Sequence, residues 1–118
     1  MENVTLGETD LMVSRMCFGS WAAGGHGWGR VCDSDSTSAI QTALEQGITF
    51  FDTADVYGFG HSEQILSSAL GAKRHDVVIA TKFGVSWTAD GRIGRDASEG
   101  YITKAVEASL RRLGVDTI

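Results

Sequence analysis

The sequence predicts an α/β fold built from repeated βα units around a parallel sheet. Three segments show helical periodicity, and each of them ends at a glycine. Short apolar runs alternate with these segments in the order strand, helix, strand, helix, strand, helix. The expected strand ends near Phe18, Phe51 and Thr81 lie 33 and 30 residues apart. Such regular spacing is typical of a chain of βα units.

The expected strands follow a short hairpin at the start of the chain. Residues 1–13 contain two alternating pieces around Gly7–Asp10, which predict a hairpin before the first sheet strand. Strands are predicted at Ser14–Gly19, Ile48–Asp52 and Val77–Phe83. The last two are β-branched or aromatic and almost continuously apolar, which is typical of parallel strands buried on both faces. We therefore expect these two to be adjacent, with Phe51, Val78 and Ile79 buried in any complete barrel, on one strand face or the other.

Each expected helix has a start signal, an apolar stripe and a glycine after its last turn. The three segments are bounded by Ser36 and Gly47, by Ser62 and Gly71, and by Ser98 and Gly114. Ser36 can cap the first helix, Ser62 and Ser98 open the other two, and the glycines can adopt the left-handed conformation common after a helix. Glu63 in the first turn of the second helix, and Arg111 and Arg112 in the last turn of the third, suit the helix dipole.

Strand spacing alone does not decide between two parallel-sheet architectures. A closed (β/α)8 barrel needs roughly 31 residues per unit, and a doubly wound open sheet has a similar period. Three strands cannot close a barrel. The segment VDTI that follows Gly114 is typical of the start of a further strand. We therefore expect residues 1–118 to be the N-terminal part of a single domain, truncated before its fourth strand.

Composition limits the classes of partner. The chain has 118 residues, with 10 Lys and Arg against 15 Asp and Glu, and its 42% hydrophobic content is ordinary for a globular protein. Its basic residues are scattered, which argues against nucleic acid or an anionic membrane as a partner. No apolar run reaches the roughly 18 residues of a membrane span, and the acidic start does not resemble a signal peptide. We expect a cytoplasmic protein, in which Cys17 and Cys32 are reduced, small, buried side chains.

Two charged residues stand at the C-terminal ends of neighbouring expected strands. Asp52 and Lys82 follow apolar runs, and the strand alternation points their side chains to the same face. In parallel α/β folds this edge of the sheet carries the active site. Tyr57 follows Asp52 in the next loop, and a cation beside its phenol would favour the phenolate, making Tyr57 a candidate general acid. The alternatives are a rim salt bridge and a tyrosine packed on a loop.

The end of the first expected strand offers further candidates for ligand binding. Gly19 allows a ligand to approach the backbone closely, Ser20 follows it, and Trp21 offers a flat apolar wall. Trp21 could equally fill the core. The glycine-rich segment Gly24–Gly29 lacks the spacing of a dinucleotide fingerprint, so we reject it as a phosphate cradle. His26, His61 and His75 are too far apart in sequence, and too isolated from cysteine pairs, to support a metal site.

Four segments together resemble the N-terminal part of an aldo-keto reductase. They are LGETDLMVSRMCFGSW at Leu6–Trp21, GITFFDTADVYGFGHSEQILSSAL at Gly47–Leu70, VVIATKFG at Val77–Gly84 and AVEASLRRLGVDTI at Ala105–Ile118. The resemblance is greatest to bacterial members with a YGxGxSE signature, and it spans nearly the whole chain. It implies a (β/α)8 TIM barrel, here about three βα units preceded by a β-hairpin. It also implies an extended NADPH, with NADH not excluded, bound without a Rossmann fingerprint.

The resemblance assigns roles to individual residues. It implies that Tyr57 donates a proton to a small carbonyl substrate, that Lys82 makes this tyrosine more acidic, and that Asp52 orients the lysine. Trp21 would lie beside the nicotinamide and the substrate, with Gly19, Ser20 and Asp52 also near the cofactor and Tyr57 in contact with the substrate. A histidine that completes the family's catalytic set would lie beyond Ile118, as would the later loops that hold the cofactor. Because those loops are needed to position the hydride donor, we expect residues 1–118 alone to be inactive.

The family pattern leaves a second class of function open. Non-catalytic relatives that resemble potassium-channel β subunits share the barrel and use it for regulation or binding. An open βα layer that associates through its strand edges is a third reading. One departure from the family concerns the third helix, where DASEGYI stands in place of a usual proline and is expected to weaken the first turn slightly.

Overall fold

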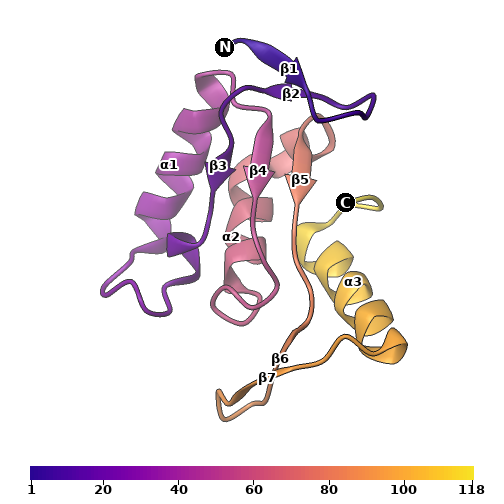
Figure 1. Ribbon diagram of the computed structural model, residues 1–118. Coiled ribbons are helices and arrows are strands. Elements are labelled where there is room, and N and C mark those ends of the chain that lie inside the picture. The colour runs from indigo at the N-terminus through magenta and orange to yellow at the C-terminus, as the bar shows by residue number, and fades with distance from the viewer.

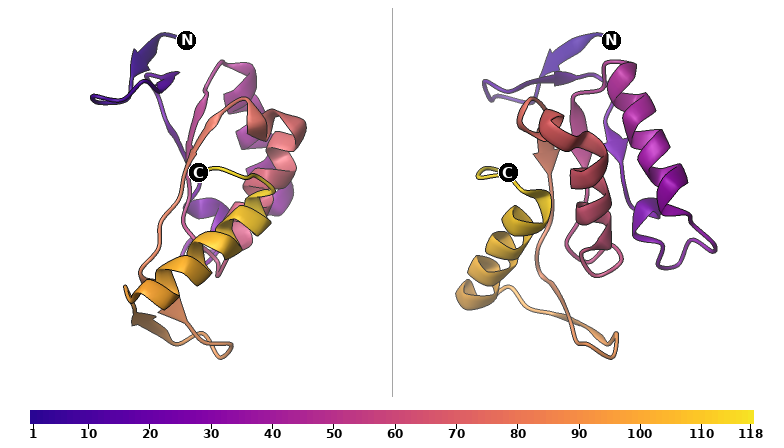
Figure 2. Two further views of the ribbon diagram at one scale, coloured as in Figure 1. Left: turned by 90° about the vertical axis from the view of Figure 1, so that its right-hand side faces the viewer. Right: turned by 180° about the vertical axis from the view of Figure 1, so that it is seen from behind.

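Three parallel strands carry three helices on one face in the computed structural model, which describes residues 1–118. The strands of this sheet are β3 (Phe18–Gly19), β4 (Phe50–Asp52) and β5 (Val78–Ala80), and the helices are α1 (Asp33–Glu45), α2 (His61–Leu70) and α3 (Glu99–Leu113). Seen from the side, the strands form one layer and the helices a second (Figure 2). The opposite face of the sheet is uncovered.

The sheet has the order β3-β4-β5, and both pairings are parallel. Phe51 pairs with Phe18 on one side and with Ile79 on the other. This arrangement confirms that the second and third expected strands are adjacent and parallel. The strands are shorter than the apolar runs that predicted them. In particular, Ser14 belongs to an earlier strand, because the chain bends at Arg15 and Met16 before β3 begins.

The hydrophobic core lies between the sheet and the helices. Its buried residues are Ile40, Ala43, Phe51, Leu66, Ala69, Leu70, Ile79 and Leu113. Phe51 and Ile79 point toward the helices and are buried as predicted. Val78 is only half-buried, because strand alternation turns it to the face that no helix covers. Burial of Val78 was expected only in a complete barrel, which the three parallel strands of residues 1–118 do not form, so for Val78 it stays a prediction.

The helix ends agree with the glycine signals better than with the serine signals. Each helix is followed by a glycine with positive φ, at Gly47, Gly71 and Gly114. Ser98 is the N-cap of α3, and its side chain accepts a hydrogen bond from the Tyr101 amide. Ser36 does not cap α1, which begins at Asp33. Asp33 and Asp35 both lie in its first turn, where their charges favour an earlier start.

Two antiparallel hairpins lie at opposite edges of the sheet (Figure 1). The first, β1 (Asn3–Thr5) with β2 (Met12–Ser14), confirms the predicted hairpin and lies across the N-terminal ends of the strands. Ser14 joins it to the sheet through two hydrogen bonds of 2.9 Å with Thr49. The second, β6 (Val85–Trp87) with β7 (Ile93–Arg95), lies beyond the C-terminal edge and was not predicted.

Two short 3-10 helices complete the fold, and residues 115–118 form no strand. The 3-10 helices are η1 (Ala22–Gly24) and η2 (Gly71–His75). The expected start of a fourth strand at VDTI is thus not present, since Val115 packs against the core instead of pairing with β5. A hollow of about 410 Å³ extends along the free side of β5, between Leu11, Val77 and Ile118. It is lined by the sheet edge and lies away from the charged strand ends.

The two cysteines are free, as expected, but both are exposed rather than buried. Cys17 lies two residues before Gly19 and therefore on the uncovered face of the sheet. Cys32 is the N-cap residue of α1, at the surface. Their predicted burial was wrong, because small apolar character alone does not say which face of a sheet a residue occupies.

Candidate active site at the strand ends

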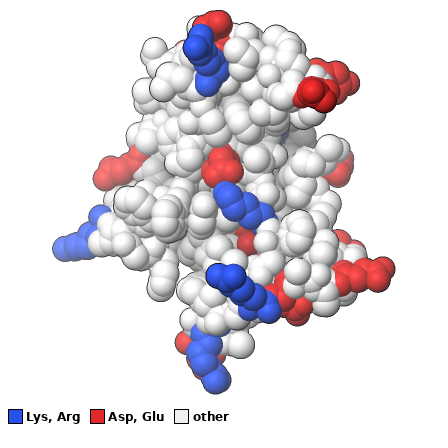
Figure 3. Space-filling model, in the orientation of Figure 1, with Lys and Arg blue, Asp and Glu red and all other residues white.

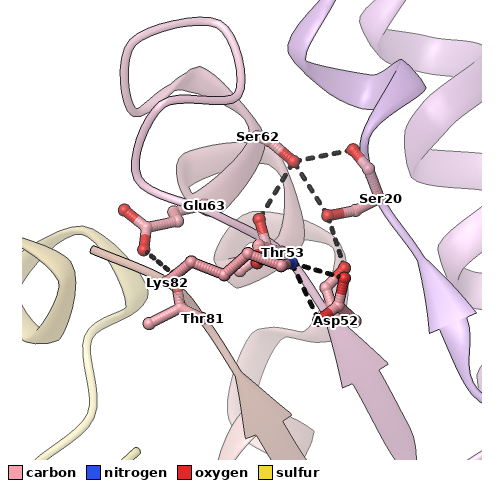
Figure 4. A network of polar contacts seen from close by, with 7 residues as sticks. All are labelled: Ser20, Asp52, Thr53, Ser62, Glu63, Thr81 and Lys82. Atoms are coloured by element: carbon pink, nitrogen blue, oxygen red, sulfur yellow. Dashed lines mark hydrogen bonds and ion pairs between the residues drawn. The ribbon is translucent and has the colours of Figure 1, made fainter. Parts of the chain in front are cut away.

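Asp52 and Lys82 form an ion pair at the C-terminal edge of the sheet. Asp52 is the last residue of β4, and Lys82 lies two residues after the end of β5 on the same face. The Lys82 Nζ donates to Asp52 Oδ1 at 2.9 Å and to Oδ2 at 2.7 Å, and also to the Thr53 carbonyl at 2.8 Å (Figure 4). The predicted contact between the two residues is therefore present. Their side chains are 36% and 47% exposed, so the pair remains accessible to a ligand.

The surroundings of Lys82 favour its charged form. Partial burial disfavours the ammonium, but the hydrogen bond and charge of Asp52, together with the Tyr57 phenol, outweigh this effect and raise the pKa of Lys82. A lysine held as a cation in this way is a fixed positive charge at the strand edge. An exposed ion pair adds little to stability, so its position matters more than its contribution to folding.

Tyr57 lies above this pair, in the loop between β4 and α2. Lys82 Nζ is 5.0 Å from the centroid of the Tyr57 ring. Trp21 stacks on the same ring, with centroids 5.7 Å apart and planes inclined by 21°. Trp21 is 56% exposed, so it does not fill the core. The four residues Asp52, Lys82, Tyr57 and Trp21 thus meet at one edge, as predicted from their places in the sequence.

Two glycines set the position of the Tyr57 loop against the Trp21 segment. A Cβ on Gly24, at the end of η1, would lie 2.6 Å from the Tyr57 carbonyl carbon, and one on Gly58 would meet the Gly24 carbonyl oxygen still more closely. Gly58 also has a φ of 60°, a conformation that other residues adopt at a cost. The backbones of the two segments are therefore in direct contact, which no residue larger than glycine permits.

The other two candidate residues at the end of β3 differ in accessibility. Gly19 is exposed, and open space surrounds the position a Cβ would take, so a flat ring could approach the backbone there. Ser20 is only 2% exposed. Its hydroxyl donates to the Asp52 carbonyl at 3.0 Å and lies 2.8 Å from the Ser62 hydroxyl, and its amide also donates to the Asp52 carbonyl. Ser20 thus faces into the protein.

Sequence reasoning missed four aromatic rings at the same edge. Trp28 makes an edge contact with Trp21, with centroids 5.3 Å apart. Phe59 lies between His26 and Trp87, at centroid distances of 5.4 and 5.9 Å. These rings come from the Gly24–Gly29 loop, the Tyr57 loop and the unpredicted hairpin, so only the packing of three separate segments brings them together. The only sign of this cluster in the sequence was the presence of two aromatic residues, His26 and Trp28, in the glycine-rich Gly24–Gly29 loop.

The charges of the remaining surface do not form a binding patch on the face that carries this site. Basic and acidic side chains are scattered over it (Figure 3). No group of three or more His, Cys, Asp or Glu is arranged to hold a metal ion. None of the helices has both the length and the apolar composition required to cross a membrane. The strand edge is therefore the place where the residues suited to chemistry gather.

Comparison with known proteins identifies the family. The family model described as "Aldo/keto reductase family" matches residues 15–118. The chain is 41% identical to aldo-keto reductase YhdN of Bacillus subtilis and 39% identical to the NADH-specific methylglyoxal reductase of Escherichia coli. It is also 34% identical to an Arabidopsis thaliana protein named "Probable voltage-gated potassium channel subunit beta". All three matches cover the whole of this chain, which spans 36%, 40% and 35% of the respective relatives.

Solved structures agree with this assignment. A glycerol dehydrogenase of Gluconobacter oxydans superposes with a TM-score of 0.85 at 42% identity, over 98% of this chain and 37% of its own. The holo form of an aldo-keto reductase of Bacillus halodurans superposes with a TM-score of 0.87 at 36% identity, over 100% of this chain and 38% of its own. These neighbours are TIM barrels, which decides between the two architectures that strand spacing left open. The chain belongs to the aldo/keto reductase family, and its three βα units and hairpin correspond to an N-terminal portion of that barrel.

Proposed function

We propose that this chain carries the proton-donor part of an NADPH-dependent carbonyl reductase, in which Tyr57 protonates the carbonyl oxygen of an aldehyde or ketone. The observation that carries the proposal is the meeting of Lys82, Asp52 and the Tyr57 ring at one accessible strand edge. Family membership supports the reaction class. The product is an alcohol, and the cytoplasm is the proposed site of the reaction.

In this proposal each residue acts through the contacts described above. Asp52 and the Thr53 carbonyl hold the Lys82 ammonium in place. The ammonium stabilises the negative charge that forms on Tyr57 when the phenol gives up its proton. Trp21, stacked on Tyr57, shields one side of the ring and offers an apolar wall to the substrate.

The residues at the end of β3 fit a flat nicotinamide ring. Gly19 leaves open space at the strand end beside Asp52, and Trp21, two residues further on, is exposed. The reduced nicotinamide supplies the hydride when bound. Gly19, Trp21 and Asp52 would orient the nicotinamide. Ser20 would act indirectly, because its buried side chain contacts the Asp52 backbone instead of the open space. We propose NADPH as the donor. One relative is named as NADH-specific, so the choice of nucleotide needs a direct comparison of the two.

The alternative, a regulatory or binding subunit, rests on the potassium-channel relatives alone. No contact in this structure favours it. A histidine that completes the family's set is expected in the polypeptide beyond Ile118, where its presence would support the enzyme.

Substitution of Lys82 tests the proposal in the full polypeptide that contains these residues. Lys82→Met removes the charge beside Tyr57, so we expect carbonyl reduction, followed by the loss of reduced nicotinamide absorbance, to fall by about 10²-fold or more. Lys73→Met is the matched control. Lys73 lies in η2, is exposed and pairs only with Asp76, which follows η2. Its substitution should leave turnover unchanged. Equal turnover in the two variants would contradict the proposal.

A further inference from the structure

The first turn of α2 buries two polar residues behind the strand ends. Ser62 and Glu63 are both fully buried. Burying a hydroxyl or a carboxylate is unfavourable unless hydrogen bonds compensate for the lost water. Figure 4 shows that both side chains point toward the C-terminal ends of the sheet strands rather than toward other residues of their own helix. Two adjacent helical residues therefore contact the sheet at the edge where Asp52 and Lys82 lie.

Ser62 joins the ends of β3 and β4. The Thr53 hydroxyl donates to Ser62 Oγ at 3.1 Å, and the Ser62 and Ser20 hydroxyl oxygens are 2.8 Å apart. Ser20 in turn donates to the Asp52 carbonyl. The Ser62 hydroxyl itself donates to the Ser20 carbonyl at 2.8 Å, so the hydroxyls of Thr53, Ser62 and Ser20 each have an acceptor. A buried polar network in which every hydroxyl has an acceptor holds its members in one arrangement.

Glu63 joins the end of β5 to α3. Its Oε1 accepts a hydrogen bond from the Thr81 hydroxyl at 2.7 Å, and its Oε2 accepts from Arg112 Nε at 2.6 Å. Arg112 lies against Gly60, where a Cβ would come within 2.7 Å of the arginine Cδ. The guanidinium is thus fixed between α3 and the start of α2, and both carboxylate oxygens of the buried glutamate are occupied.

Both threonines are directly linked to the ion pair at the strand edge. Thr53 follows Asp52, and its carbonyl accepts a hydrogen bond from Lys82. Thr81 precedes Lys82. Because alternate residues of a strand point to opposite faces, each threonine reaches the helix layer while its neighbour faces the uncovered side. The first turn of α2 therefore fixes, from behind, the backbone that carries both charged residues.

We propose that Ser62 and Glu63 are positioning residues, which hold the ends of three strands in register so that Lys82 meets Asp52 and Tyr57. The inference rests on the function proposed above for those three residues. Catalytic groups tolerate little displacement, since a shift of about 1 Å can lower the rate by about 10²-fold. A hydrogen-bonded connection between a helix and three strand ends is suited to preventing such a shift.

The test compares isosteric substitutions in the full polypeptide. Thr81→Val keeps the shape of the side chain but removes the hydroxyl that donates a hydrogen bond to Glu63. Thr81→Ser keeps this hydroxyl. Ser62→Ala removes the connection to Ser20 and Thr53. Ser67→Ala is the matched control, because Ser67 lies on the same helix and donates one hydrogen bond, to the Leu113 carbonyl at 2.7 Å, on the side away from the strand ends.

Two readouts are measured on each variant, and only one needs activity. The first is the titration of Lys82 Nζ by NMR, which reports how closely Asp52, Tyr57 and the Cys17 thiol surround it. The second is kcat for carbonyl reduction and its pH profile. For Thr81→Val and Ser62→Ala we expect the pKa of Lys82 to fall toward its ordinary value, and kcat to fall by about 10-fold to 10²-fold. Thr81→Ser and Ser67→Ala should match the wild type in both.

The outcomes separate this inference from the proposed function. If the wild-type protein reduces no carbonyl compound, the proposed function fails, and the Lys82 titration still decides whether Ser62 and Glu63 position the lysine. The inference is wrong if Lys82 has the same pKa in Thr81→Val and Ser62→Ala as in Ser67→Ala and the first two variants lose only thermal stability. The hydrogen bonds would then be merely structural.

Discussion

Both carboxylate oxygens of Asp55 are buried without a hydrogen-bond partner. Asp55 lies in the loop between β4 and α2, two residues before Tyr57. Burial raises the pKa of this carboxyl, with the nearby Glu63 charge acting in the same direction, and neighbouring amides and Arg112 only partly offset the effect. The folded protein therefore holds the Asp55 proton more tightly than the unfolded chain does.

Asp55→Asn should stabilise the protein at neutral pH. Because the pKa is raised on folding, the contribution of Asp55 to stability falls as pH rises from about 3.9 through the folded value. We expect the variant to melt a few degrees above the wild type at pH 7, and the difference to vanish below about pH 4, where the carboxyl is protonated in both states. Thermal unfolding across this range, with the exposed Asp116→Asn as control, measures the effect. A lower melting temperature for Asp55→Asn at pH 7 would count against it.

Single residues at the site were predictable to different degrees. Asp52 and Lys82 could be predicted, because each is the polar residue at the end of an apolar run and strand alternation places both on one face. Glu63 was predicted only as a residue favourable for the helix dipole. Its contacts with Thr81 and Arg112 join residues 18 and 49 positions away, and such distant partners leave no local pattern in one sequence.

At the scale of elements, the contact between η1 and the Tyr57 loop leaves no room for a side chain at Gly24. Gly24→Ala introduces a Cβ 2.6 Å from the Tyr57 carbonyl carbon, so the loop must move. We expect a loss of about 1–3 kcal/mol of stability together with a fall in carbonyl turnover. Gly100→Ala, in the first turn of α3 with open space around it, should instead gain up to about 1 kcal/mol and keep turnover. Similar turnover in the two variants would contradict a positioning effect of the glycine contact.

The helices could be predicted more accurately than the connections between elements. Apolar spacing and terminal glycines gave the helices almost in full, because both signals are local. The hairpin β6–β7 was missed although Asp90 and Gly91 form a turn dipeptide between alternating segments. The strand predicted after Gly114 is absent although β5 has a free side, since Val115 packs against the core instead of pairing with it.

At the scale of the whole molecule, one face of the sheet is covered and the other is not (Figure 2). Phe50 and Val78 on the uncovered face remain half-exposed, and β5 has one unpaired side. Residues 1–118 purified alone should therefore associate through these surfaces and reduce no carbonyl compound. Size-exclusion chromatography at several concentrations, NADPH titration by fluorescence and an assay of varied aldehydes measure this. A monomer with micromolar NADPH affinity and turnover would overturn the expectation.

The central claim is that Tyr57 is the proton donor, and Tyr57→Phe in the full polypeptide tests it most directly. The substitution removes one hydroxyl and retains the ring that stacks on Trp21, so the site should keep its shape and its affinity for NADPH. Turnover with an aldehyde that the wild type reduces is the measurement. We expect it to fall by about 10²–10⁴-fold, with NADPH binding by fluorescence titration unchanged. Turnover equal to that of the wild type would contradict the claim.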